Sequence, residues 1–443
     1  MRANTAILYF LVVAALAGFL VPAARAQKVS GLDRDRALQM LDEVAKDVRK
    51  HYYDPKFHGV DWDAKVAEAR NKIKNETSLN LALAHIAAAL ISLDDSHTFF
   101  LPPPRPYRHD YGLQTQMVGD HCYVSRVRPG SDAEARGVKP GDEVLAVEGY
   151  PPTRQTLWKL DYRFRLLRPQ ADLQMALRDP AGGERQVVVK AKIVNLKRVL
   201  NWTLSDGGSD VWDTLREQEG ASHRLRIRYN SLGDKLLVAK LPVFFFDQAE
   251  VDALLDQARK HQALILDLRG NPGGAIDTLK FLVGGFFENE VQIGKRVGRK
   301  ELKPEAAKSR GRGIFTGKLT VLVDSASGSC AELFARLVQL EKRGQVIGDR
   351  SAGSVMEARH YGHEAGVDTV VFYGASITES DLIMSDGKSL EHSGVTPDEL
   401  LLPTAADLAA GRDPVLASAA GRLGAKLTPE DAGKMFPYEW PPE

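Results

Sequence analysis

Apolar residues recur with helical spacing from residue 33 to about residue 93. The first helix shows the i, i+3, i+4 pattern of an amphipathic helix at Leu38, Leu41, Val44, Ala45 and Val48. A second helix is predicted near Asp61–Lys74, and a third over Leu79–Leu93, which is rich in alanine and leucine. Three consecutive prolines, Pro102–Pro104, end this helical region because proline cannot continue a helix.

From about residue 107 to residue 195 the pattern changes to short strands. The predicted strands are Leu113–Val118, His121–Val127, Asp142–Gly149, Leu173–Leu177 and Arg185–Val194. Residues 196–224 contain a Gly-Ser-Asp-rich stretch and a charged stretch, and we interpret them as a connection.

Strands and helices alternate after residue 224. The strands are predicted at Arg224–Asn230, Asp234–Phe244, Leu264–Gly270, Thr320–Ser325 and Gln345–Asp349, and the helices at Gln248–His261, Ile276–Phe286 and Ala331–Glu341. Residues 402–423 are again helical in pattern. This alternation predicts an α/β core built on a mostly parallel sheet.

The amino-acid composition excludes some classes of function but does not identify one. The chain has 443 residues, 44% of them hydrophobic and 26% charged, which is typical of a soluble globular protein. A net charge of +1 gives no reason to expect nucleic acid as a partner. The two cysteines, Cys122 and Cys330, cannot form a metal-binding array, and because we place them in different domains we expect no disulfide. No metal or organic cofactor is implied.

The N-terminus has the order of a secretory signal. Arg2 precedes the apolar run Ile7–Val21, and Ala24-Arg25-Ala26 gives a small-x-small cleavage site. The run is shorter than the roughly 20 residues of a stable membrane span. We therefore expect cleavage after Ala26 and a periplasmic or extracellular protein; the alternative is an uncleaved N-terminal anchor.

Two strand ends carry the residues of greatest chemical interest. One apolar run begins at Leu264 and ends in a charged, glycine-rich turn that reaches Gly274. A second apolar run begins at Thr320 and ends in the serine-rich turn Ser325–Glu332. If the two strands are neighbours in one sheet, one turn presents backbone N–H groups and the other a hydroxyl. The simpler interpretation is a tight turn beside a serine that caps a helix.

The segment Val127–Gly149 resembles a PDZ domain of the type found in exported proteases. It shows a strand, a turn, a short helix, Gly-Val, a Lys-Pro-Gly-Asp turn and a second strand. The peptide-binding loop of such a domain falls on Tyr111-Gly112-Leu113-Gln114, where the usual loop is Gly-Leu-Gly-Phe. The resemblance implies capture of a C-terminal peptide by strand addition, and the alternative is a small β-domain without a ligand.

The chain as a whole resembles peptidase family S41, which includes C-terminal (tail-specific) processing proteases and tricorn-type proteases. Six pieces match in order: residues 93–103, 127–149, 264–274, 321–335, 346–354 and 389–401. The resemblance implies a crotonase/ClpP-like α/β catalytic core with a helical N-terminal segment and an inserted PDZ domain. The expected division is a signal peptide (1–26), an N-terminal helical region (27–104), a PDZ-like domain (105–195), a connection (196–224), the catalytic core (225–420) and a C-terminal tail (421–443).

The resemblance also implies the site. The nucleophile of the family falls on Ser329, at a turn before a helix, where the helix dipole favours an oxyanion. The oxyanion donors fall on the N–H of Gly273 or Gly274 and on the N–H of Cys330.

The general base is the part of the family pattern that differs. The processing branch uses a lysine after the strand that ends at residue 348, but this chain has Ser354 and no lysine nearby, and arginine is too basic to serve. The tricorn-type branch uses a histidine, which falls on His97, with Ser96 and Glu391 to orient it. The alternative is a structural His97, because lysine-using relatives carry a histidine near this place.

These expectations favour an exported serine endopeptidase acting on polypeptides through Ser329 and His97. Two other functions stay open: a catalytically silent PDZ-containing scaffold, and an esterase with the same site.

Overall fold

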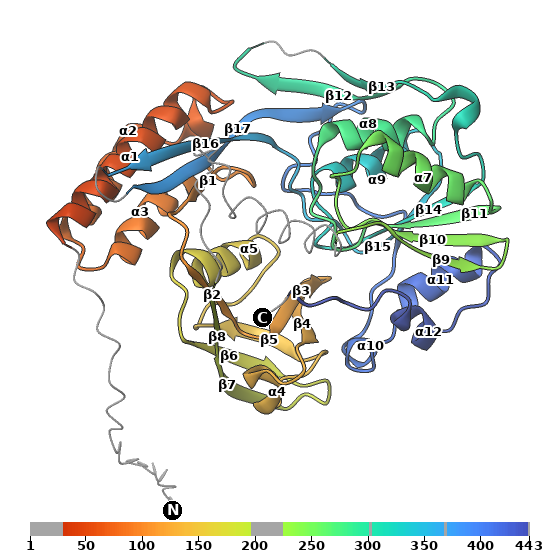
Figure 1. Ribbon diagram of the computed structural model, residues 1–443, viewed down its shortest axis with the longest axis horizontal. Coiled ribbons are helices and arrows are strands. Elements are labelled where there is room, and N and C mark those ends of the chain that lie inside the picture. The colour runs from red at the N-terminus through yellow and green to blue at the C-terminus, as the bar shows by residue number, and fades with distance from the viewer. Residues whose placement is uncertain (1–29, 196–224, 301–303, 367–369, 442–443) are drawn as a thin grey trace, which may run out of the picture.

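The computed structural model describes residues 30–195, 225–300, 304–366 and 370–441 (Figure 1). The predicted signal peptide and the predicted connection therefore lie outside the described residues. Within the described ranges, no helix is both long enough and apolar enough to cross a membrane.

Three helices form the N-terminal region, as predicted: α1 (Gly31–His51), α2 (Trp62–Asn75) and α3 (Leu79–Ile91). Side chains cap the N-termini of the first two helices: Ser30 and Asp61 accept hydrogen bonds from backbone N–H groups of the first turn. The buried faces of these helices pack against an antiparallel sheet at Leu41, Leu90, Phe100 and Ile377. Its strands are β1 (Phe99–Leu101), β12 (Val291–Gly298), β13 (Glu305–Ala307), β16 (Glu357–Ala365) and β17 (Val371–Met384).

Residues 107–195 form what we call the β-domain. Its main sheet is antiparallel, in the order β3-β4-β5-β6-β7. The strands are β3 (Leu113–Val118), β4 (His121–Val127), β5 (Glu143–Val147), β6 (Asp172–Arg178) and β7 (Glu184–Lys190). Two short helices, α4 (Asp132–Ala135) and α5 (Leu157–Asp161), accompany it, and α5 continues into a π-helical turn, Tyr162–Leu167.

The remaining sheet is mostly parallel and forms the body that carries the two turns. Its order is β18-β15-β14-β11-β10-β9, with only β9 antiparallel to its neighbour. The strands are β9 (Arg228–Leu232), β10 (Leu236–Lys240), β11 (Ala263–Asp267), β14 (Lys318–Val323), β15 (Gln345–Gly348) and β18 (Glu399–Leu400).

Helices cover both faces of this sheet (Figure 1). One face packs on α7 (Gln248–Ala258), α8 (Ile276–Gly284) and α9 (Cys330–Leu340). The other packs on α11 (Pro414–Arg422) and α12 (Pro429–Lys434), after the short helix α10 (Ala405–Ala409). Because both faces are covered, β11 reads as a continuous apolar run.

Three features differ from the sequence-based expectation. Residues Arg185–Val194 do not form one strand: β7 ends at Lys190, and β8 (Lys192–Asn195) pairs instead with β2 (Tyr107–Asp110). The antiparallel sheet under the N-terminal helices was not expected. The segment expected as a tail contains α12, whose Ala432 is buried against the parallel sheet.

Candidate active site

The glycine-rich and serine-rich turns meet at one edge of the parallel sheet. Strands β11 and β14 are parallel neighbours, which confirms the predicted placement. The Gly328 N–H donates to the Asn271 carbonyl over 2.8 Å, and the Gly270 N–H donates to Asp324 Oδ1 over 2.8 Å. These bonds fix the two turns against each other.

Ser329 occupies a sharp bend between β14 and α9. Its φ of 52° and ψ of −121° are unusual for a residue with a side chain. Hydrogen bonds of the Ser329 N–H hold the bend: this group donates to the Ser354 carbonyl at 2.8 Å and to Glu332 Oε2 at 3.0 Å. A serine held in a strained strand-to-helix turn presents its hydroxyl at the surface of the sheet edge.

Glu332 holds this bend together with the loop opposite. Its carboxylate is fully buried and accepts four hydrogen bonds: from the N–H groups of Ser329, Gly353 and Ser354 and from the Ser351 hydroxyl, at 2.6–3.0 Å. Burial raises the pKa of Glu332 to about 7, against the lowering effect of these donors. The sequence alone predicted no role for this residue.

The expected oxyanion donors lie directly beside Ser329. A Cβ on Gly273 would come within 2.4 Å of the Ser329 Cβ and 3.0 Å of the Cys330 nitrogen. The Gly273 N–H itself donates to Asn271 Oδ1 at 2.8 Å. The N–H groups of Gly274 and Cys330 have no acceptor among the described residues, so these two are the donors available to a substrate carbonyl.

Ser96, His97 and Glu391 form a hydrogen-bonded set, although 295 residues separate the first from the last. Ser96 Oγ lies 2.7 Å from His97 Nδ1 and donates to Glu391 Oε2 at 2.9 Å, while the Ser96 N–H donates to Glu391 Oε1 at 2.7 Å. Asp95 Oδ1 accepts from the His97 N–H and shapes the loop. The structure thus brings together the three residues that the tricorn-type pattern predicted.

The tautomer of His97 follows from this geometry. The Ser96 hydroxyl has one hydrogen and donates it to Glu391, so it accepts from His97 Nδ1–H. That leaves Nε2 with the lone pair. Burial lowers the pKa of His97, an effect that Asp95 opposes and His360 adds to, and burial raises the pKa of Glu391. A neutral imidazole with a free Nε2 is the form a general base requires.

A continuous set of hydrogen bonds connects the nucleophile turn to the histidine set. The Ser354 carbonyl accepts from the Ser329 N–H, and the next N–H, that of Val355, donates to Glu391 Oε2 at 3.0 Å. Among the described residues, no hydrogen bond joins the Ser329 hydroxyl to the His97 ring. Catalytic hydrogen bonds of this kind often tighten only when substrate is bound.

Asp267 and Arg269 fix the glycine-rich turn through an ion pair. Two bonds at 2.8–3.0 Å join their side chains, and Arg269 makes two more, at 2.7 and 2.9 Å, with Asp413. Lys240 Nζ lies 3.1 Å from Asp267 Oδ1. Asp267 is buried, whereas Lys240, Arg269 and Asp413 are partly exposed, and the network supports the glycine-rich turn.

The β-domain contacts the nucleophile turn directly. The Ser325 hydroxyl donates to the Met117 carbonyl at 2.5 Å, and Gln116 Nε2 donates to Asp324 Oδ2 at 2.6 Å. Both β-domain residues lie on β3, the first strand of its sheet. A ligand at this strand therefore lies close to the turn that carries Ser329.

The four residues expected in a peptide-binding loop, Tyr111 to Gln114, differ in their surroundings. Tyr111 and Leu113 are buried in the core of the β-domain. The Gly112 N–H donates to Asp110 Oδ1 at 2.9 Å. Leu113 and Gln114 both line the cavity between the β-domain and the body.

His360 and His363 both lie on strand β16. His363 bonds to Asp47, and His360 lies on the exposed side of β16. The described residues contain no cluster of His, Cys, Asp and Glu suited to a metal ion. His392 Nε2 lies 3.0 Å from the Asp94 carbonyl. Cys122 and Cys330 are both free and buried.

Comparisons with known proteins place this site in a family. A model of peptidase family S41 matches residues 235–401, which include both turns and Glu391, and a model of the tricorn protease C1 domain matches residues 33–75. Residues 235–401 of this chain thus form a peptidase family S41 domain. S41 is a family of serine peptidases. The turn that carries Ser329 lies within the matched residues.

The curated relatives come from both branches of the family. The chain is 25% identical to the putative tricorn protease homolog 2 of Streptomyces coelicolor over 88% of its length, and 24% identical to the tail-specific protease of Haemophilus influenzae over 69%. It spans only 32% and 43% of these two relatives. The chloroplastic carboxyl-terminal-processing peptidase 1 of Arabidopsis thaliana is 24% identical over 83% of this chain and 71% of that protein.

A solved structure shows the same fold. The crystal structure of mature CPAF superposes with a TM-score of 0.63 at 17% identity, covering 85% of this chain and 94% of CPAF. The S41 fold seen here is thus mixed α/β, with N-terminal helices, several antiparallel sheets and one mostly parallel sheet.

Replacing Gly273 by alanine should impair the site more than it impairs the fold. The new Cβ would collide with the Ser329 Cβ, and a misplacement of about 1 Å costs on the order of 100-fold in rate. Gly270→Ala is the matched control, because Gly270 also has a positive φ, of 71°, but nothing within 4 Å of the added carbon. Peptide hydrolysis and thermal unfolding of both variants provide the test. Equal losses of activity would mean that backbone strain, and not contact with Ser329, is responsible.

The buried Glu332 predicts a pH-dependent stability. Its pKa is about 7 in the folded state against 4.5 for the free group, so the folded state holds the proton more tightly. This group therefore reduces the free energy of unfolding as the pH rises from about 4.5 to about 7. Glu332→Gln removes the titration, and urea unfolding between pH 5 and pH 8 should show a flatter pH dependence for the variant. Parallel curves for the two proteins would contradict the prediction.

Proposed function

We propose that this S41 protein is an exported serine endopeptidase that cleaves polypeptides through an acyl-enzyme on Ser329. The observation that carries the proposal is the Glu391–Ser96–His97 set, bonded through Val355 and Ser354 to the Ser329 turn. It supplies a base in a chain that lacks the lysine of the processing branch. The predicted signal peptide supports export to the periplasm or beyond.

The reaction uses these residues in two half-reactions. Ser329 Oγ attacks the scissile carbonyl carbon while its proton passes to His97 Nε2, and the carbonyl oxygen becomes an oxyanion facing the N–H groups of Gly274 and Cys330. The C–N bond then breaks, and His97 gives the proton to the departing amine. A water attacks the ester in the same way, with His97 again the base, and releases the acid and free Ser329. Ser96 and Glu391 orient the imidazole and stabilise its cation.

The β-domain would bring substrate to this site. Its resemblance to a PDZ domain and the bonds between β3 and the Asp324–Ser325 turn support recruitment or gating of substrate through a C-terminal peptide. A substrate bound there would lie beside the nucleophile turn.

Cleavage of unfolded polypeptides tests the proposal. The purified protein is incubated with a denatured protein and with p-nitrophenyl acetate, and peptide products are identified by mass spectrometry in the wild type and in Ser329→Ala. The proposal predicts new peptides only with the wild type. Ester hydrolysis without peptide products would instead support an esterase with the same site.

One observation favours a second function, a peptide-binding scaffold without catalysis: the absence of a hydrogen bond between Ser329 and His97 in the described residues. A scaffold would bind peptides in both the wild type and Ser329→Ala and would cleave neither proteins nor esters.

A further inference from the structure

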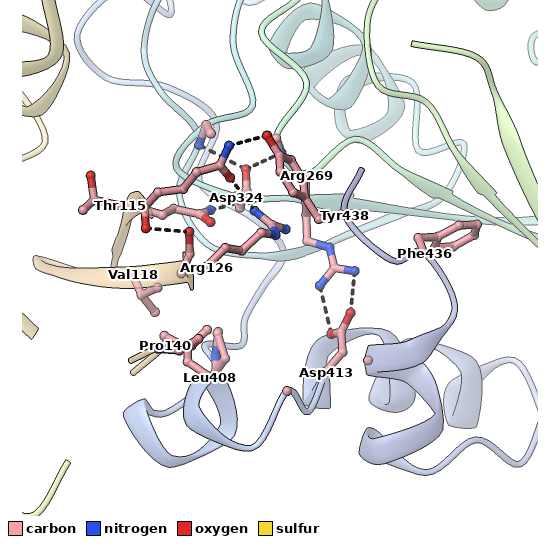
Figure 2. A pocket seen from close by; sticks show the side chains of 18 of the residues that line it. Thr115, Val118, Arg126, Pro140, Arg269, Asp324, Leu408, Asp413, Phe436 and Tyr438 are labelled. Carbon is pink, nitrogen blue, oxygen red and sulfur yellow. Dashed lines mark hydrogen bonds and ion pairs between the residues drawn. The ribbon is translucent and has the colours of Figure 1, made fainter. Parts of the chain in front are cut away.

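A large cavity separates the β-domain from the body. Its volume is about 1320 Å³, and Figure 2 shows Arg126, Arg269 and Tyr438 among the side chains that line it. The nucleophile side of the cavity includes Asp324, and its β-domain side includes Gln114 and Arg126. The cavity is thus next to the elements that hold Ser329, but Ser96, His97, Ser329 and Glu391 are not among the residues that line it.

The segment Pro437–Pro441 runs along this cavity, which its residues 438–441 help to line, and it contacts arginines of the β-domain. The Arg126 guanidinium lies 4.6 Å from the centre of the Tyr438 ring, and that of Arg128 lies 4.8 Å from the centre of the Trp440 ring. At such distances a guanidinium is attracted to the face of an aromatic ring. The Arg128 side chain also donates to the Pro441 carbonyl at 3.2 Å.

Polar contacts extend along the same segment. Gln114, which faces Arg126 across β3 and β4, donates to the Tyr438 hydroxyl. Arg228 of the body donates to the Pro437 carbonyl at 2.8 Å. Side chains of the β-domain and of the body thus contact two groups of the segment: its two aromatic rings, and the main-chain carbonyls of Pro437 and Pro441.

The segment is held on a surface and is not part of a core. None of the residues Pro437–Pro441 is buried, and Tyr438 keeps 38% of its surface exposed. By contrast α12, which ends at Lys434, packs on the body through the buried Ala432. The last residues can leave the cavity without opening the hydrophobic core, since they contribute no buried side chain to it.

We propose that the face formed by Gln114, Arg126 and Arg128 is a binding surface for extended polypeptide segments that carry two aromatic residues spaced as Tyr438 and Trp440 are, and that Pro437–Pro441 of this chain occupies it in cis. A polypeptide that carries such a segment must displace Pro437–Pro441 to bind. Because the segment is tethered, it competes at an effective concentration on the order of millimolar. That this competitor is a substrate rests on the proposed function, but the binding itself does not.

The test compares binding of a peptide with the sequence of residues 437–443, Pro-Tyr-Glu-Trp-Pro-Pro-Glu, to two forms of the protein. Both carry Ser329→Ala so that no hydrolysis occurs, and one lacks residues 437–443. Fluorescence anisotropy of the labelled peptide should show binding to the shortened form and at least about tenfold weaker binding to the full chain. Arg126→Ala in the shortened form should weaken binding at least about tenfold, whereas Arg49→Ala, on the distant helix α1, should not.

A full-length variant makes the test independent of the truncation. Tyr438→Ala combined with Trp440→Ala removes both rings that stack on the arginines and leaves the chain length unchanged. The proposal predicts that this variant binds the peptide more tightly than the intact chain. Equal binding to the intact chain, the shortened chain and the double variant, or no binding to any of them, would overturn it. Either result would leave the cleavage test of Ser329 unaffected, so the two proposals fail separately.

Discussion

Replacing Ser329 by alanine is expected to reduce kcat/KM for peptide hydrolysis by about 10⁴-fold to 10⁶-fold, the loss seen when a peptidase loses its nucleophile. The backbone of the turn should survive, because its fixing bonds involve the Ser329 N–H and not the side chain. The free energy of unfolding should change by less than about 1 kcal/mol. Initial rates with an unfolded protein substrate and urea unfolding measure the two effects.

Ser325→Ala is the matched control on the same turn. The Ser325 hydroxyl donates to the Met117 carbonyl and takes no part in the proposed chemistry. Its loss should change kcat/KM by less than about tenfold, the scale of one hydrogen bond. If Ser325→Ala removed activity and Ser329→Ala did not, the nucleophile would be misassigned.

Replacing His97 by alanine is expected to reduce kcat by about 10³-fold to 10⁴-fold with little change in KM, since the base acts in the transition state. The pH profile provides a sharper test. A base works in its neutral form, and burial lowers the pKa of His97 below its ordinary 6.5. Activity in the wild type should therefore persist below pH 6.5 and fall only at lower pH. The acidic fall should disappear from the residual activity of His97→Ala.

Replacing Glu391, which bonds to His97 through Ser96, should lower kcat less than replacing His97 itself. Glu391→Gln keeps the shape of the site but removes the charge that stabilises the imidazolium, so its effect on kcat should be smaller than that of His97→Ala. An unchanged acidic fall in His97→Ala would mean that another group titrates, and His97 would then be structural.

Much of the fold follows from local patterns in the sequence. The N-terminal helices, the strands β10, β11, β14 and β15 and the helices between them were predicted because they are long and strongly periodic, or are apolar throughout as buried parallel strands are. The antiparallel sheet was missed because β16 has mostly exposed residues and β17 mixes buried polar and apolar residues. Neither strand shows a clean alternation that would identify it.

The site was predictable in part, and for a different reason. Two strand ends that follow apolar runs can be placed side by side from sequence, and β11 and β14 are so placed. The meeting of Ser96 with Glu391 has no local signal, because it depends on how the N-terminal helices sit on the antiparallel sheet, and only the family resemblance indicated it. The role of Glu332 was missed because a glutamate early in a helix ordinarily points to solvent.

The central claim is that Ser329 is a nucleophile activated by His97, and labelling with a fluorophosphonate probe tests it most directly. The probe is applied to the wild type, Ser329→Ala and His97→Ala, and the modified residue is identified by mass spectrometry. The account predicts modification of Ser329 in the wild type, none in Ser329→Ala and strongly slowed modification in His97→Ala. Undiminished labelling of Ser329→Ala, or labelling of His97→Ala as fast as that of the wild type, would contradict it.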